Sequence, residues 1–406
     1  MKILRLSSKE IQNLCDRYYY NKKRVTEKVR RIIDDVREDG DRAVIRYTRR
    51  FDKVKLSPRD LKVSASEING AFQNIDTGFI SDLKAIIENI QRFHKRQVPK
   101  PWKIKQGEGV VLGEMFSPIE SVGIYVPAGT APHVSSVYMS VLPARIAGVK
   151  KIILVTPPTK FNSVDPHILA VANLLKVDEV YKIGGAQAIA ALAFGTKTIP
   201  KVDKIVGPGN NYVTEAKRQV FGYVDIDMLA GPSEVVILAN QFSDKDYVIQ
   251  DLMAQAEHLK GLAILVTTSK KFAKAMKKEI QKGYIVLAKN LAQAAEVINR
   301  IAPEHLEILI KRPNRVLKLV RNAGAVFIGP YSPVCIGDYV AGPSHVLPTG
   351  GTARFFSGLG VRAFLKSTHT ISYTKKALEK EKDAIERMTK IEGMDKHLES
   401  FRVRFR

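Results

Sequence analysis

The residues best suited to chemistry are histidines with an acidic or amide neighbour, and most of them follow residue 250. Imidazole combined with carboxylate or amide oxygen, without thiolate, suits a catalytic zinc or manganese ion better than a structural one. A glutamate directly before a histidine can also act with it as a general acid–base pair. The candidate groupings are Gln255 with His258, Glu304 with His305, Asp338 with His345, and Glu392 with His397.

Two turns have the composition of an anion-binding loop. Gly184-Gly185-Ala186-Gln187 ends one Val- and Ile-containing segment, and Gly207-Pro208-Gly209-Asn210 ends the next. Small residues let the backbone approach a ligand closely, and a helix that begins at such a turn favours a phosphate group at its N-terminus. Neither turn matches Gly-x-Gly-x-x-Gly, so the dinucleotide fingerprint is absent. A tight turn without a ligand remains the alternative for each.

These residues need a scaffold, and the pattern from about residue 120 onward predicts one. Short Val- and Ile-rich runs alternate with amphipathic segments, which indicates parallel strands buried on both faces. Because the runs are too numerous for one modest sheet, we expect an α/β fold with two doubly wound Rossmann-like domains. The first ~115 residues and the tail from Leu365 have helical periodicity and predict small N- and C-terminal helical extensions. The expected strands are 121–127, 151–158, 179–185, 204–209, 234–240, 262–268, 306–310 and 324–329.

Composition excludes several classes of protein. The 406 residues are 45% hydrophobic and 26% charged, which excludes a disordered or collagen-like chain. Cys15 and Cys335 form no Cys-x-x-Cys, which argues against a zinc finger and a disulfide framework. No apolar run approaches the ~18–20 residues of a membrane span, and the first ten residues lack the core of a signal peptide. We therefore expect a soluble cytoplasmic protein that does not contact a membrane.

The formal net charge of +24 would suit a nucleic-acid partner. The excess Lys and Arg residues fall in helix-like stretches such as 21–31, 270–283 and 311–321, where they alternate with apolar positions. Such alternation is typical of a solvated helix face. The chain contains no recognisable nucleic-acid-binding module, so we expect no nucleic-acid partner.

The residues alone thus predict an α/β enzyme with a His/carboxylate site and a phosphate-bearing ligand. Across essentially its whole length, the chain also resembles the histidinol dehydrogenase family. The longest matching run extends from Lys204 to Asn240. Further segments that match in order and spacing are GIYVPAGTAP, IGGAQAIAALAFGT, DLMAQAEH, APEHLEI, GDYVAGPSHVLPT and EGMDKH.

The resemblance implies an enzyme that oxidises L-histidinol to L-histidine through histidinaldehyde, the final step of histidine biosynthesis. It implies two NAD+ per reaction and one zinc ion per subunit. Carried over by motif, Glu304 and His305 would be the catalytic acid–base pair. The implied zinc ligands are Gln255, His258, Asp338 and His397. The implied substrate contacts are Ser233, His305, His345 and Glu392 with the four zinc ligands, and the implied NAD contacts are Tyr125, Gln187 and Asn210.

We expect the domains to follow the changes in sequence texture. Residues 1–22 would be an N-terminal extension, and residues 23–124 with 235–362 the first Rossmann-like domain. Residues 125–234 would be the second, with the NAD-binding turns. In the family the C-terminal segment crosses to the partner subunit. Residues 363–406 would accordingly be a helical arm that completes the neighbour's active site in a homodimer.

Alternatives remain for single residues and for the function. Gln255 could be a helix C-cap contact, because a neutral amide oxygen binds zinc poorly, and Tyr125 could belong to a strand core. The competing functions are a relative that acts on a different amino alcohol and a basic nucleic-acid-binding protein that has lost catalysis. The latter predicts a damaged site, yet the chain retains Gln255, His258, Glu304, His305, Asp338 and His397.

Overall fold

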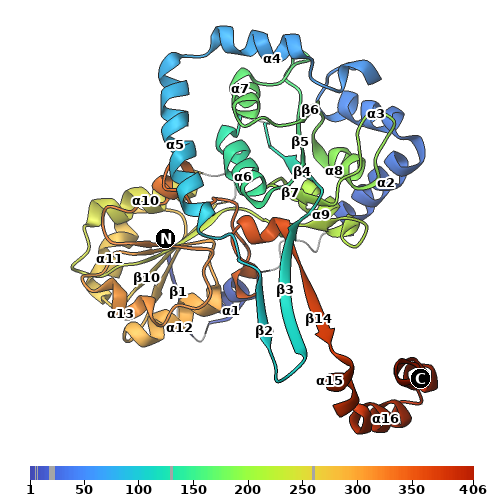
Figure 1. The fold of residues 1–406 in the computed structure, drawn as a ribbon. Helices are drawn as coiled ribbons and strands as arrows, with labels where there is room; N and C mark the ends of the chain where they lie inside the picture. The colour runs from blue at the N-terminus through green and yellow to red at the C-terminus, as the bar shows by residue number, and fades with distance from the viewer. Residues whose placement is uncertain (5, 7, 18–22, 129–130, 258–260) are drawn as a thin grey trace. The chain divides into compact units, whose positions relative to one another are not determined.

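The computed structural model describes residues 1–4, 6, 8–17, 23–128, 131–257 and 261–406 (Figure 1). Contacts divide the chain into two compact units. The first comprises Met1–Gln97 and Ile119–Phe364, and the second comprises Val98–Pro118 and Leu365–Arg406. The first unit contains two parallel sheets, and the second contains an antiparallel sheet followed by helices.

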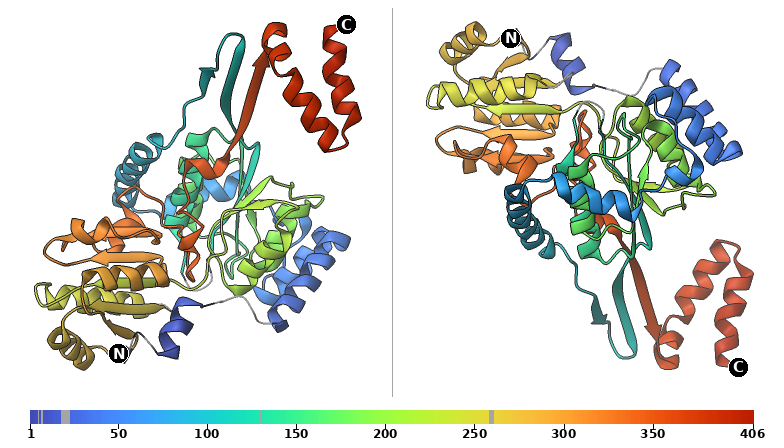
Figure 2. Two further views of the ribbon diagram at one scale, coloured as in Figure 1. Left: turned by 90° about the horizontal axis from the view of Figure 1, so that it is seen from below. Right: turned by 90° about the horizontal axis from the view of Figure 1, so that it is seen from above.

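A six-stranded parallel sheet forms one half of the first unit. Its strand order is β1-β11-β10-β9-β12-β13. Successive side chains of a strand point to opposite faces, and helices cover both faces (Figure 2). One face packs against α10 (Lys245–Glu257) and α11 (Lys270–Glu279), and the other against α1 (Lys9–Cys15), α12 (Leu291–Ile301) and α13 (Pro313–Leu317). The strands are β1 (Lys2–Leu4), β9 (Glu234–Leu238), β10 (Leu262–Thr267), β11 (Tyr284–Leu287), β12 (His305–Ile308) and β13 (Ala325–Ile328).

A five-stranded parallel sheet forms the other half, in the order β6-β5-β4-β7-β8. Its strands are β4 (Ser121–Tyr125), β5 (Lys151–Thr156), β6 (Glu179–Lys182), β7 (Lys204–Val206) and β8 (Asp225–Ile226). One face packs against α4 (Ala65–Ala71), α5 (Thr77–Lys95), α6 (Val134–Ala147) and α7 (Pro166–Leu174). The other face packs against α8 (Gly185–Phe194) and α9 (Asn211–Val220), which are covered in turn by α2 (Lys23–Asp39) and α3 (Asp41–Phe51).

Both sheets have the Rossmann strand order. From β4 onward, the five-stranded sheet reads 3-2-1-4-5 in chain order, and the six-stranded sheet reads the same from β9 once β1 is set aside. The order reverses between β4 and β7 in one sheet and between β9 and β12 in the other. The prediction of an α/β fold with two doubly wound sheets is therefore confirmed.

The two terminal regions were predicted wholly helical, and this is wrong for parts of both. β2 (Trp102–Lys105) and β3 (Val110–Pro118) pair with β14 (Leu365–Tyr373) in an antiparallel sheet of order β14-β3-β2. Most side chains of β2 and β14 are exposed. Strand β2 alternates over only four residues, and β14 is mostly polar, so the alternation by which a strand is predicted is weak in both. Helices α15 (Lys375–Lys380), α16 (Lys382–Ile391) and α17 (Asp395–Arg402) follow β14.

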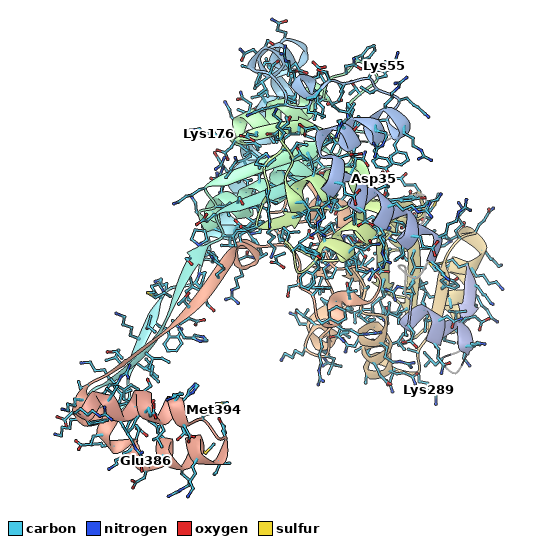
Figure 3. All side chains as sticks on the ribbon, turned by 90° about the vertical axis from the view of Figure 1, so that its right-hand side faces the viewer. Asp35, Lys55, Lys176, Lys289, Glu386 and Met394 are labelled. Atoms are coloured by element: carbon cyan, nitrogen blue, oxygen red, sulfur yellow. The ribbon has the colours of Figure 1, made fainter. Side chains whose placement is uncertain are left out.

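The packing groups the N-terminal segments differently from the expected domains. Strand β1 pairs with β11 and so belongs to the six-stranded sheet, although residues 1–22 were expected as a separate extension. Helices α2 and α3 pack on the five-stranded sheet's helices, whereas residues 23–124 were expected to join 235–362. Within the described ranges no helix is long and apolar enough to cross a membrane. Basic side chains such as Lys55, Lys176 and Lys289 are exposed at the periphery of the first unit (Figure 3).

Candidate functional site

Glu304 and His305 lie where the amino ends of β12 and β9 meet. The Ser233 hydroxyl donates a hydrogen bond to Glu304 Oε2 at 2.8 Å, and the Glu234 backbone N–H donates to the same oxygen at 2.9 Å. His305 Nδ1 lies 3.1 Å from the Glu234 carbonyl oxygen and 3.5 Å from Glu304 Oε2. The backbone of one residue on β9 therefore orients both members of the predicted acid–base pair.

These contacts determine which nitrogen of His305 is available for chemistry. A carbonyl oxygen can only accept a hydrogen bond, so the contact with Glu234 assigns a hydrogen to Nδ1. In the neutral ring, Nε2 then carries the lone pair. Nε2 is buried, has no hydrogen-bond partner among the described residues, and lies 3.7 Å from Asp338 Oδ1. A buried polar atom without a partner is rare in folded proteins, and here it indicates a place for a ligand.

The electrostatics couple the two residues. Burial raises the pKa of Glu304 to about 7, although the neighbouring His305 opposes that rise. Burial by itself would lower the pKa of His305, but the carboxylates of Glu304 and Asp338 outweigh it and raise that pKa to about 9. Each charge thus favours the opposite charge on its neighbour. Both groups are buried: Glu304 would exchange its proton near neutral pH, whereas His305 keeps its ring proton until about pH 9.

Gln255 reaches the same level of the sheet as His305, as the geometry of α10 and β12 requires. His305 and Glu307 point to the face that α10 covers, because they share the register of Val235 and Ile237. Helix α10 runs antiparallel to the strands it connects, and the carboxyl group of Asp251 is close enough to that of Glu307 to raise its pKa. One turn of helix and two residues of strand both advance by roughly 6 Å. Gln255, one turn after Asp251, therefore lies level with His305.

Helix α14 (Val334–Tyr339) also contacts Glu307 and His305, the two residues of β12 that face α10. The Val334 backbone N–H donates to Glu307 Oε1 at 3.0 Å, and Asp338, one turn later, lies beside His305. The site is therefore built in two layers. Asp251, Glu307 and Val334 form the lower layer, and Gln255, His305 and Asp338 form the upper one.

His345 fixes the loop that carries Asp338. Its Nδ1–H donates to the Asp338 carbonyl oxygen at 3.0 Å, and the Ser136 hydroxyl lies 3.3 Å from its Nε2. Burial lowers the pKa of His345, so the neutral ring is favoured. Because both ring nitrogens already have partners, the structure places His345 as a support for Asp338, and a substrate contact would require one of these bonds to open.

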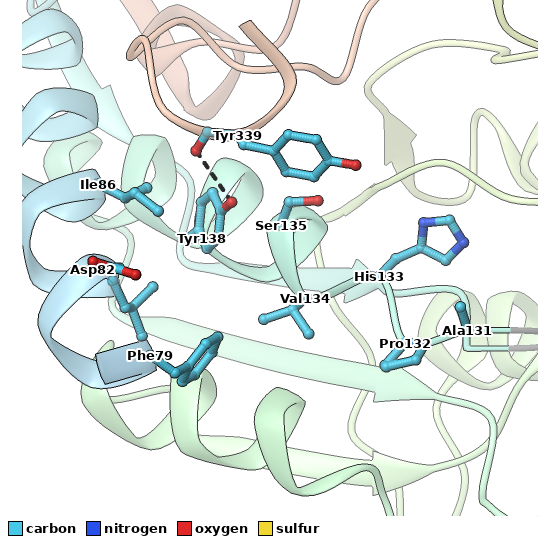
Figure 4. A pocket seen from close by; sticks show the side chains of 11 residues that line it. Phe79, Asp82, Ile86, Ala131, Pro132, His133, Val134, Ser135, Tyr138 and Tyr339 are labelled. Carbon is cyan, nitrogen blue, oxygen red and sulfur yellow. Dashed lines mark hydrogen bonds between the residues drawn. The ribbon is translucent and has the colours of Figure 1, made fainter. Parts of the chain in front are cut away.

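A cavity of about 560 Å³ opens beside this cluster, and Asp338, His345 and Phe327 are part of its lining. A second cavity of about 350 Å³ lies between α5 and α6 and is closed on one side by Tyr339 (Figure 4). The Tyr138 hydroxyl donates to the Tyr339 carbonyl oxygen at 3.2 Å. Both cavities thus border the short helix that presents Asp338.

The predicted cofactor residues lie at the carboxyl ends of the five-stranded sheet, near its switch point. The Tyr125 side chain is buried, its hydroxyl accepts a hydrogen bond from the Gly185 N–H at 3.1 Å, and burial raises its pKa to about 12. Gln187 is 1% exposed, and neither polar atom of its amide has a partner within the described part of the chain. Asn210 is exposed and caps α9 by accepting from the backbone N–H groups of Tyr212 and Val213.

A buried ion pair supports the second glycine turn. Lys217 and Asp227 are almost fully buried and paired. Lys217 Nζ donates to the Gly207 carbonyl at 3.0 Å, and Asp227 Oδ2 accepts from the Gly207 N–H at 2.8 Å. Gly207 has a φ of +113°, and a Cβ there would lie 2.1 Å from the Tyr125 carbonyl oxygen. Only glycine fits where the two strands of the switch point approach.

Three further predicted residues do not belong to the described part of the first unit. His258 lies outside the described residues. Glu392 and His397 lie in the second unit, at the end of α16 and on α17, and both are exposed. In the described ranges no three His, Cys, Asp or Glu side chains are grouped closely enough to hold a metal.

Two of the predicted zinc ligands, Gln255 and Asp338, belong to the described part of the first unit, and their donor types suit a zinc ion. Gln255 is 5% exposed, and its amide nitrogen Nε2 has no hydrogen-bond partner among the described residues. The oxygen of the same amide is the atom that could bind a metal. Asp338 supplies a carboxylate at the same level. Amide and carboxylate oxygens with imidazole nitrogens, and without sulfur, form the ligand type of a catalytic zinc site.

Sequence reasoning missed the residues that support the site from behind. They could have been noticed as charges inside apolar strands, because a buried charge requires a partner. Glu234 begins the run EVVILAN and Glu307 interrupts LEILI. No comparable local signal pointed to Arg17, which contacts Glu234 from a distant segment.

The chain matches known proteins over nearly its whole length. The family model described as histidinol dehydrogenase matches residues 15–405. The chain is 46% identical to the histidinol dehydrogenase of Listeria monocytogenes serovar 1/2a, covering 100% of this chain and 99% of the relative. It is 45% identical to that of Clostridium acetobutylicum, covering 98% and 96%. The crystal structure of histidinol dehydrogenase from Elizabethkingia anophelis matches with a TM-score of 0.93 at 35% identity, covering 100% of this chain and 98% of that one.

Proposed function

The chain belongs to the histidinol dehydrogenase family, and we propose that it oxidises L-histidinol to L-histidine with two NAD+ and one zinc ion per subunit. The observation that carries the proposal is the cluster of Ser233, Glu304, His305 and Asp338, in which His305 Nε2 is buried and unpartnered among the described residues. Oxidation of an alcohol needs a base beside the hydroxyl group, and the unpartnered state of this atom supports that role.

In the first oxidation, His305 Nε2 accepts the proton of the substrate hydroxyl group as hydride leaves the carbon that bears this group. Nδ1 cannot do so, because it donates to the Glu234 carbonyl. The imidazolium that forms is stabilised by Glu304 on one side and Asp338 on the other. The same carboxylates raise the pKa of His305 to about 9, so the neutral ring that acts as the base is increasingly populated as the pH rises toward that value.

Glu304 then serves the second oxidation. It takes a proton from the water that adds to the aldehyde, which gives the hydrate that is oxidised next. Its pKa of about 7 suits this role, because a base is most useful when its pKa lies near the working pH. Ser233 and the Glu234 N–H hold the carboxylate in place throughout.

The residues that would hold zinc are Gln255, His258, Asp338 and His397. When bound, zinc would orient the substrate and act as a Lewis acid. The acidic side chains of Asp338 and Glu392 would suit the positive charge of an amino alcohol. His345 would contact the substrate if one of its two hydrogen bonds opened, and it would otherwise support Asp338.

The residues that would face NAD are Tyr125, Gln187 and Asn210, at the carboxyl ends of strands where doubly wound sheets bind ligands. NAD+ would supply the hydride acceptor. The orphaned amide of Gln187 is the strongest support, because it is buried without partners in the described chain. The partial positive charge at the N-terminus of α9 favours an anionic group such as a pyrophosphate.

We further propose a homodimer in which residues 363–406 complete the partner's site. Glu392 and His397 belong to the second unit and are exposed. Both side chains are therefore available to a partner subunit.

The proposal is tested with the full-length zinc-loaded protein, L-histidinol and NAD+. We expect two NADH per histidinol consumed, L-histidine as the product, and loss of activity on chelation with recovery on addition of zinc. A panel of amino alcohols without the imidazole ring provides the control and should turn over poorly. If the zinc-loaded protein forms no NADH with histidinol, the proposal is wrong.

A further inference from the structure

Arg17 connects the N-terminal segment to the predicted acid–base pair through one buried carboxylate. Its Nε lies 2.9 Å from Glu234 Oε2, and its Nη2 lies 2.5 Å from Glu234 Oε1. The side chains of Arg17 and Glu234 are 8% and 1% exposed. Two parallel contacts between a guanidinium and a carboxylate fix the orientation of both groups.

Glu234 lies between Arg17 and the pair on a strand whose side chains alternate between faces. Its side chain points to the face that α1 and α12 cover, the same face as Val236 and Leu238. Its backbone N–H and carbonyl oxygen, at the end of β9, contact Glu304 Oε2 and His305 Nδ1. Its Oε1 also accepts a hydrogen bond from the Glu304 backbone N–H at 3.3 Å. One residue thus contacts Glu304 through both its backbone and its side chain.

Arg17 also holds the turn that leads into Glu304. Its Nη1 donates to the Ile301 carbonyl at 3.0 Å and to the Leu14 carbonyl. Ala302 follows with a φ of +49°, in the left-handed region that a residue with a Cβ adopts at a cost of roughly 1–2 kcal/mol. Such a conformation persists where the surrounding contacts hold it. Arg17 fixes the carbonyl directly before this turn.

We propose that Arg17 and Glu234 are positioning residues for Glu304 and His305, an inference that rests on the proposed function. Neither residue contacts the substrate. Arg17 holds the Glu234 carboxylate and the turn at Ile301, and Glu234 then sets the carboxylate of Glu304 and the ring of His305. The pair also neutralises a carboxylate that would otherwise face Glu304.

The charged groups around Glu304 provide a test that distinguishes a positioning role from a merely structural one. The charged groups facing Glu304 are His305 from its own strand and Glu234 from β9, with Arg17 behind Glu234. Removal of the guanidinium leaves the Glu234 charge unbalanced, and a nearby like charge disfavours ionisation of Glu304. The acidic limb of the kcat–pH profile should therefore move to higher pH.

The experiment compares the full-length, zinc-loaded enzyme with Arg17→Met, Arg17→Lys and the double variant Arg17→Met with Glu234→Gln. We expect Arg17→Met to lower kcat on the order of 10- to 100-fold, with KM for histidinol changed less than about twofold. Arg17→Lys should return the acidic limb toward wild type with an intermediate kcat, because it restores the charge without the two-point contact. The double variant should return the acidic limb of the kcat–pH profile toward wild type, because both charges are removed, while kcat stays low.

Lys204→Met is the matched control. Lys204 forms an ion pair with Asp225 at 2.7 Å and is 7% exposed, at the amino end of β7. Its loss should lower the melting temperature without moving kcat or the acidic limb. If Arg17→Met behaves in the same way, or keeps wild-type kcat and pH dependence, the inference is overturned. If Arg17→Met does not fold, Arg17→Lys decides by the same two readouts.

A spectroscopic readout separates this inference from the proposed function. In ¹⁵N-histidine-labelled protein at one pH, the His305 ring signals, assigned with His305→Asn, should indicate a hydrogen on Nδ1. They should shift in Arg17→Met and not in Lys204→Met. If the wild type fails to oxidise histidinol, the proposed function fails, and these signals still decide the inference. Unchanged His305 signals in Arg17→Met would contradict it.

Discussion

His305 Nε2 lies 3.7 Å from Asp338 Oδ1, so the amino end of β12 meets the end of helix α14. Each residue is held from behind by a different contact. Glu234 of β9 accepts from His305 Nδ1, and His345 donates to the carbonyl of Asp338. The gap between the two side chains is therefore a fixed feature of the fold. Most of the following predictions concern the contacts that maintain this gap or the glycine turns of the five-stranded sheet.

Replacing His305 by Asn should remove the proposed base while keeping a side chain of similar polarity. We expect turnover to fall by about 10²- to 10⁴-fold, the usual contribution of general base catalysis, with bound zinc near one per subunit. Steady-state kinetics and metal analysis measure the two quantities. His369→Asn, an exposed histidine on β14, is the control and should keep wild-type turnover. Loss of zinc in His305→Asn would instead make His305 a metal ligand.

Replacing Gln187 by Met should separate ligand binding from stability. Because the amide has no partners among the described residues, its removal takes away no internal hydrogen bond, and the free energy of unfolding should stay constant or rise. KM for NAD+ should rise about tenfold, equivalent to ~1.4 kcal/mol. Gln219→Met is the matched control, because Gln219 donates to the Thr26 carbonyl at 3.0 Å and to Glu215 at 2.7 Å. It should lower stability and leave KM unchanged. The reverse pattern would show that Gln187 is a purely structural residue.

Replacing Gly207 by Ala should be strongly destabilising. The new Cβ would lie 2.1 Å from the Tyr125 carbonyl oxygen, at a φ of +113°. We expect a loss of at least about 2 kcal/mol in denaturant unfolding, because neither the backbone carbonyl nor the neighbouring strand can yield. Gly222 has a φ of +100° and nothing within 4 Å of such a Cβ. Gly222→Ala should therefore cost only the conformational term of about 1 kcal/mol. Equal losses in the two variants would contradict the close approach.

The stability of the protein should depend on pH through Glu307. Burial, and then the nearby Asp251, raise the pKa of Glu307 to about 8. The folded protein therefore keeps a proton that the unfolded chain releases near pH 4.5. The stabilisation is complete below that pH and is lost as the pH rises through about 8. Relative to Glu307→Gln, which keeps a donor for Asp251, the wild type should lose up to about 1.4 kcal/mol per pH unit in this window.

Denaturant unfolding at several pH values measures this difference. Glu296→Gln, an exposed glutamate on α12, is the control and should leave the pH dependence of the wild type unchanged. A Glu307→Gln variant whose stability changes with pH in the same way as that of the wild type would show that Glu307 does not hold the proton.

Subunit sharing should appear as complementation between two inactive variants. His397→Asn lacks a ligand on α17, and His305→Asn lacks the proposed base on β12. Mixed under conditions that allow exchange, they should recover part of the activity, because each heterodimer would contain one intact site. Mass spectrometry of differently labelled chains establishes that heterodimers have formed. Heterodimers without activity would place a complete site within each subunit.

The sequence by itself determined most strands of the two parallel sheets and the residues with which the site would be built. Buried parallel strands are nearly continuous apolar runs, and the runs that become β4, β5, β6, β7, β9, β10, β12 and β13 were all predicted close to their observed bounds. The glycine turns were likewise evident, because a backbone conformation such as that of Gly207 admits almost no other residue. Local chemistry sufficed for these features.

Only the tertiary structure decided how these residues are partnered. The acid–base pair lies at the amino ends of β9 and β12, whereas the cofactor turns lie at the carboxyl ends of the other sheet. The pairing of Arg17 with Glu234, and the support of His305 by the backbone of Glu234, join segments far apart in the chain. Periodicity indicates which face of an element is buried, but contacts between elements depend on strand order and register. Strand order and register are set by the packing of the whole domain. The sequence therefore identified the side chains of this site, and the tertiary structure determined which of them contact one another.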